Sequence, residues 1–125
     1  MMKLSEALIL GSGMIRTDGP NIFLSKDKTS GCALGCICVA IGERPRYHES
    51  YALINKTWPW TNMEVPGGQG SAISGRNTIP EEIENRFLRA GHKVGPVIEW
   101  IKEMEAKYDQ PLVEEAQECT LSSQS

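Results

Sequence analysis

A continuous apolar run at residues 31–42 constrains the fold of this chain more than any other feature. It holds no charged side chain over 12 positions. A helix that spans a bilayer needs about 20 apolar residues, so the run is too short to cross a membrane. Ser30 before it is a suitable N-cap and Gly42 stands where helices end, which predicts a helix over 31–41. Because this helix is apolar on every side, we expect it at the centre of the fold.

Further helices are predicted around this segment, which indicates a mainly α, single-domain bundle of about five helices. The first begins near Ser5 and ends at Gly11 or Gly13. Another covers 47–55 and is closed by the sequence around Pro59, because proline cannot continue a helix. Together these elements would wrap the central apolar helix.

The two C-terminal helices have clear start signals. Thr78 and Glu81 fit a capping box, and the helix that they open places Ile79, Ile83 and Phe87 on one apolar stripe. A final helix opens at Gly95-Pro96, and its apolar positions have helical spacing: Val97, Ile101, Met104 and Tyr108, with Trp100 beside them.

The domain is predicted to cover 1–110, with one short β element at 22–24. Residues 111–125 show no periodicity and are interpreted as a disordered acidic tail. The N-terminal apolar stretch 7–10 is too short for a signal peptide, so we expect a cytoplasmic protein without a membrane segment.

The charge distribution argues against nucleic acid as the main partner. The net charge is -3, from 13 Lys and Arg and 16 acidic residues. Four of the acids lie in the stretch 109–125, which has no Lys or Arg, so the rest holds 13 basic against 12 acidic residues. A nearly neutral body lacks the cations that binding to a phosphate backbone needs. Nucleic-acid binding remains an alternative, through Arg44, Arg46, Lys56, Arg86, Arg89 and Lys93.

The cysteines are concentrated in the central segment. Cys32, Cys36 and Cys38 fall within seven of its residues, and with His48 and His92 they match no zinc-site spacing. We interpret them as buried, reduced thiols and expect neither metal nor cofactor. An alternative is a cysteine-dependent enzyme with Cys32 as nucleophile, because a thiol in the first turn of a helix has a lowered pKa.

The longest irregular stretch, residues 61–77, is the candidate binding site. Its glycine-rich turns can offer backbone N–H groups to phosphate, Arg76 adds a positive charge, and tryptophan rings stack on bases. The other interpretations are a surface loop without a ligand and tryptophans that belong to the core. The predicted ligand-binding residues are Trp58, Trp60, Gly67, Gly68, Gly70, Ser71, Arg76 and Asn77.

Several short motifs resemble a loosely defined group of small prokaryotic and prophage proteins. They are Leu4-Ser5-Glu6-Ala7 with Leu10-Gly11, Cys32-Ala33-Leu34-Gly35 closed by Ile41-Gly42, and Trp58-Pro59-Trp60. Proteins of this group commonly continue with a Cys-x-x-Cys pair, where this chain has its glycine-rich stretch instead. The resemblance covers about the first half of the chain, implies a bacterial or phage origin, and brings no established activity with it.

The leading hypothesis is therefore a non-enzymatic binding protein of a bacterial or phage cell. The loop from Trp58 to Asn77 would sequester a small nucleotide-like molecule or occlude the surface of a protein partner. Assembly of the chain into a homo-oligomer is a further possibility that we keep open. Nucleic acid and a membrane are not expected as partners.

Overall fold

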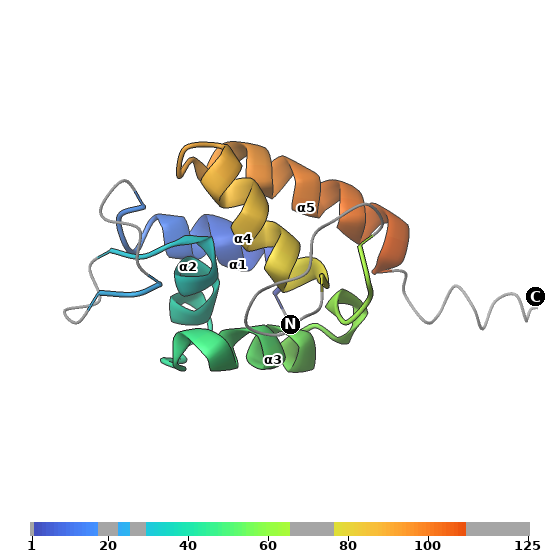
Figure 1. The fold of residues 1–125 in the computed structure, drawn as a ribbon, viewed down its shortest axis with the longest axis horizontal. Coiled ribbons are helices and arrows are strands. Elements are labelled where there is room, and N and C mark those ends of the chain that lie inside the picture. Colours follow the sequence, from blue (N-terminus) through green and yellow to red (C-terminus); the bar gives the residue numbers. More distant parts are fainter. Residues whose placement is uncertain (1, 18–22, 26–29, 66–76, 110–125) are drawn as a thin grey trace, which may run out of the picture.

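The computed structural model describes residues 2–17, 23–25, 30–65 and 77–109. These residues form five α-helices and one short 3₁₀-helix, which confirms the mainly α bundle (Figure 1). The elements are α1 (Leu4–Ser12), α2 (Ala33–Ala40), α3 (Tyr47–Thr57), η1 (Pro59–Thr61), α4 (Ile79–Arg89) and α5 (Val94–Tyr108). The expected tail at 111–125 and the loop residues 66–76 lie outside the described residues.

Helix α2 lies at the centre of the fold, as its composition predicts. Every residue from Ala33 to Val39 is buried, and the helix contacts α1, α3 and α4 (Figure 1). Its contact with α1 is a contact between backbones. A Cβ atom added at Gly11 would lie 1.9 Å from the carbonyl oxygen of Cys36, so α1 can pack this closely only with glycine there.

The start of α2 differs from the prediction. The helix begins at Ala33 with Cys32 as its N-cap, and Ser30 is not the capping residue. Gly31 forms an isolated bridge with Leu24, and the Cys32 N–H donates to the carbonyl of Phe23 at 3.1 Å. These tertiary hydrogen bonds hold the residues before Ala33 in an extended conformation, which a helix starting after Ser30 would not allow.

Extended pairing is limited, within the described residues, to two isolated bridges. Arg16 pairs with Ser30 in parallel and Leu24 with Gly31 in antiparallel fashion. The short β element expected at 22–24 is thus a single bridge at Leu24, and its first residue lies outside the described residues.

Three of the helices begin with the same device. A glutamate at the third helical position accepts a hydrogen bond from the backbone N–H of the residue before the helix, which satisfies one of the free donors at a helix start. The pairs are Lys3 with Glu6 at 2.8 Å, Arg46 with Glu49 at 3.0 Å, and Thr78 with Glu81 at 2.8 Å. The last pair confirms the predicted capping box.

The C-terminal helices also follow the predicted pattern. The stripe Ile79, Ile83 and Phe87 is fully buried on α4, and the chain turns after it at Gly91, whose φ is +70°. On α5, Val97, Trp100 and Ile101 are buried.

Two details of α5 need correction. The helix begins at Val94, so Gly95 and Pro96 lie inside its first turn, where proline needs no N–H partner. Tyr108 was expected on the buried stripe and is exposed, at the last position of the helix. Within the described part of the chain, no helix has both the length and the apolar character to cross a membrane.

Candidate functional site

Most of the predicted binding residues fall in the stretch that the structure does not describe. Gly67, Gly68, Gly70, Ser71 and Arg76 lie outside the described residues. The structure places Trp58, Trp60 and Asn77.

The two tryptophans have different environments. Trp58 is buried, and its indole N–H donates to the carbonyl of Met2 at 2.9 Å, so it serves the core and has no exposed ring face for a ligand. Trp60 is half-buried against the core, and its indole nitrogen is buried without a hydrogen-bond partner. Of the pair, Trp60 is the one that retains an unused donor.

Asn77 lies at the point where the chain returns from the glycine-rich stretch. The Val65 N–H donates to the Asn77 carbonyl at 2.7 Å, and the Asn77 N–H donates to Glu64 Oε1 at 3.3 Å. These bonds join the two ends of the stretch 66–76. Asn77 itself is 4% exposed, so its side chain is directed into the protein.

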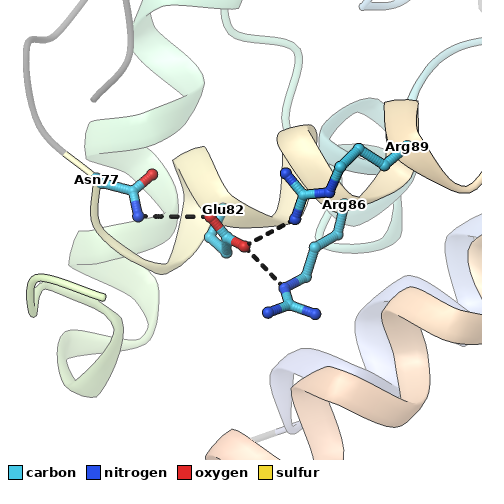
Figure 2. A network of polar contacts seen from close by, with 4 residues as sticks. All are labelled: Asn77, Glu82, Arg86 and Arg89. Carbon is cyan, nitrogen blue, oxygen red and sulfur yellow. Dashed lines mark hydrogen bonds and ion pairs between the residues drawn. The ribbon is translucent and has the colours of Figure 1, made fainter. Parts of the chain in front are cut away.

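The Asn77 side chain belongs to a polar network on α4 (Figure 2). Glu82 Oε2 accepts hydrogen bonds from Arg86 Nε at 2.8 Å and from Arg89 Nη2 at 3.1 Å. Glu82 Oε1 accepts from Asn77 Nδ2 at 3.4 Å, and Asn77 Oδ1 is buried without a partner. Positions four and seven residues apart lie on one helix face, so one carboxylate holds two guanidinium groups side by side.

The two arginines are organised but still accessible. The side chain of Glu82 is 5% exposed, whereas those of Arg86 and Arg89 are 39% and 63% exposed. The Arg86 guanidinium also lies 4.5 Å from the ring centroid of Trp100 on α5, a cation–π contact. Within the described residues, Glu82 uses Nε of Arg86 and one terminal nitrogen of Arg89. Each guanidinium therefore retains an edge that can bind an oxyanion.

A second polar cluster lies on the opposite side of α4. Burial raises the pKa of the Glu84 carboxyl, an effect partly offset by hydrogen bonding from Cys32 and Tyr47 and by the charge of His92. Glu84 Oε1 is buried without a hydrogen-bond partner. The hydroxyls of Tyr47 and Tyr51 lie 2.7 Å apart beside this cluster. No cation is in hydrogen-bond contact with Glu84 among the described residues.

The cysteines behave as core residues. Cys32, Cys36 and Cys38 are buried free thiols, which confirms the interpretation from the sequence. Burial raises the pKa of Cys32, and the charge of Glu84 adds to the effect, although backbone hydrogen bonds at Gly35 and Leu34 oppose it. The expected lowering by the helix start is therefore wrong, because desolvation is the larger effect. Burial also raises the pKa of Cys36 and of Cys38 to about 12.

The cations proposed for nucleic-acid binding do not form one patch. Lys56 belongs to α3 and Arg44 and Arg46 precede it, whereas Arg86 and Arg89 end α4 and Lys93 follows. Figure 1 shows α3 and the turn from α4 to α5 on opposite sides of the molecule. Of these six residues, Arg86 and Arg89 are brought together by a shared contact.

A hollow of about 770 Å³ lies between α1 and α5, and Ser5 and Glu105 are among the residues that line it. The Glu105 carboxylate accepts hydrogen bonds from the backbone N–H and the hydroxyl of Ser5, both at 2.8 Å. This acid is thus occupied in holding the start of α1. The described residues contain no group of three His, Cys, Asp or Glu side chains that could bind a metal ion.

Comparisons with protein-family models, with curated proteins and with solved structures found no match for this chain. The structure gives a physical role to two glycines of the short motifs in the first half of the chain. Gly11 contacts the backbone of Cys36, and a Cβ atom at Gly35 would lie 2.1 Å from the Phe23 carbonyl oxygen.

Sequence reasoning missed Glu82 and treated Arg86 and Arg89 only as members of a dispersed basic set. A signal was available, because the three residues have helical spacing on a helix with a clear start. The burial of Glu82 and the contact with Trp100 required the tertiary structure.

Proposed function

We propose that this chain is a non-enzymatic binding protein that holds a small anionic, nucleotide-like ligand at Arg86 and Arg89. The observation that carries the proposal is the pair of guanidinium groups held by one buried carboxylate, each with an edge left over. A guanidinium edge donates two parallel hydrogen bonds and matches the oxygens of a phosphate. A bacterial or phage cytoplasmic role, sequestering such a molecule, is part of this proposal.

The arrangement favours binding because the donors are positioned before a ligand arrives. Arg86 is restrained by Glu82 on one edge and by the Trp100 ring on one face. Little side-chain entropy is then lost when an anion binds. Asn77, which follows the glycine-rich stretch in the sequence, donates its side-chain amide to Glu82 and so belongs to the same network.

The enzyme alternative has less support. A nucleophilic cysteine needs a thiolate, and burial raises the pKa of Cys32 instead of lowering it. Glu84 adds a negative charge next to the thiol, which disfavours the thiolate further.

The proposal is tested by isothermal titration calorimetry of the full chain with adenosine and guanosine monophosphates, cyclic monophosphates and diphosphates. The variant R86K/R89K keeps both positive charges but loses the planar edges, so we expect affinity to fall about tenfold or more. The matched control R44K/R46K makes the same change on the other side of the molecule and should leave affinity unchanged. Equal affinity of the two variants, or no binding of any nucleotide by the wild type, would contradict the proposal.

A further inference from the structure

The charge of the arginine site is smaller than its two cations imply. Arg86 and Arg89 contribute two positive charges, and Glu82, in direct contact with both, removes one. Among the described residues of this contact network, the remaining net charge is a single positive one. The guanidinium groups also differ in exposure, at 39% and 63%, so a bound anion would be partly removed from water beside Arg86.

A single net charge discriminates between kinds of phosphate. The attraction of an anion to the site grows in proportion to the anion's charge, whereas the cost of desolvating it grows with the square of that charge. A phosphomonoester above pH 7 carries close to two negative charges, since its second pKa is about 6. The second charge would be partly desolvated next to Glu82, and the described contacts of the network supply no further cation to balance it.

We infer that the arginine pair selects a singly charged phosphodiester, as in a cyclic nucleotide, over a phosphomonoester. A phosphodiester has two non-bridging oxygens that share one negative charge, and each oxygen can face the free edge of one guanidinium. Glu82 is then the residue that determines specificity, because its negative charge lowers the net charge of the arginine pair from two to one. This inference rests on the proposed function and names the ligand class of the same site.

The test compares adenosine 3′,5′-cyclic monophosphate with adenosine 5′-monophosphate by calorimetry at pH 8. The wild type should bind the cyclic nucleotide about tenfold more tightly. At pH 5 the linear nucleotide is mostly a monoanion, so its affinity should approach that of the cyclic one. E82Q raises the net charge by one and should shift the preference toward the linear nucleotide at pH 8.

The matched control is E99Q, which changes an exposed acid on α5 by the same charge and should leave the preference as it is. Tighter binding of the linear nucleotide by the wild type would overturn the inference and leave the proposed function standing. Equal shifts of the nucleotide preference in E82Q and E99Q would also overturn the inference and leave the proposed function standing. If neither nucleotide binds, both the inference and the proposed function fail. If a single-stranded oligonucleotide binds more tightly than the cyclic nucleotide, with a steep salt dependence, the ligand is a nucleic acid and the inference is overturned.

Discussion

Glu82 and Glu84 stand two residues apart on α4 and have opposite surroundings. Because each helical residue turns by about 100°, they lie on opposite sides of the helix. Glu82 is the more buried of the two, yet it contacts two arginines and an amide. Glu84 faces a thiol and a phenol, and one of its oxygens has no hydrogen-bond partner.

The difference shows that burial by itself does not decide how a carboxyl group behaves. At Glu82 the cations compensate for lost solvation, and the paired charges are available to organise a binding surface. At Glu84 no described cation touches the acid, and burial raises its pKa. One face of α4 thus carries charge toward solvent, and the other holds a titratable group inside the protein.

Removing both cations should make Glu82 resemble Glu84, and it is the change with the largest expected effect. Breaking a buried ion pair costs about 3–5 kcal/mol, and the exposure of the guanidiniums lowers our expectation for R86A/R89A to about 2 kcal/mol. Urea unfolding of this variant and of R44A/R46A measures the effect. A loss below 0.5 kcal/mol, or one as large in the control, would show that the network contributes little to stability.

The pH dependence of stability should separate the two acids further. Because the pKa of Glu84 is raised above its ordinary value of 4.5, the folded protein holds a proton that the unfolded chain releases. The stability from this group is fully present below that ordinary value and is lost as pH rises through the folded pKa. E84Q cannot ionise, so its stability relative to the wild type should rise between pH 4 and pH 9.

Urea unfolding over that pH range measures the difference between E84Q and the wild type, in which the other titrations cancel. E99Q serves as the matched control, because it removes the charge of an exposed acid on α5. A constant difference for E84Q would mean that Glu84 titrates equally in the folded and unfolded states.

The smallest predicted effect concerns the chemical reactivity of Cys32, the thiol next to Glu84, and of the two other buried cysteines. Raising a thiol pKa from 9.0 to about 12, as for Cys36 and Cys38, lowers the thiolate fraction at pH 8 about a thousandfold. Cys32 should be at least as unreactive, since burial and the charge of Glu84 both raise its pKa. Peptide mapping after iodoacetamide treatment should show slow labelling of all three until urea is added. Fast, selective labelling of Cys32 in the native protein would revive the cysteine-enzyme hypothesis.

The sequence predicts the helices well where the determining contacts are local. The start of α4 follows from Thr78 and Glu81, which are three residues apart, and its buried stripe follows from helical spacing. The predicted start of α2 was wrong because the true start depends on the bridge to Leu24 and the hydrogen bond to Phe23. Local spacing in the sequence does not reveal these contacts.

The candidate site was only partly predictable for the same reason. The sequence singled out Asn77 and, within a larger set, Arg86 and Arg89. It does not show that Trp100 lies against Arg86, because that contact joins two different helices. It also gives no reason to expect Trp58 in contact with Met2, which removes that ring from the candidate site.

The backbone contact between Gly11 and Cys36 has a consequence for how the molecule opens. Two helices that touch through main-chain atoms cannot separate by the rotation of side chains. Local fluctuations that release one helix must therefore disturb the other, and the amide protons of α1 and α2 should exchange with deuterated solvent as one cooperative unit.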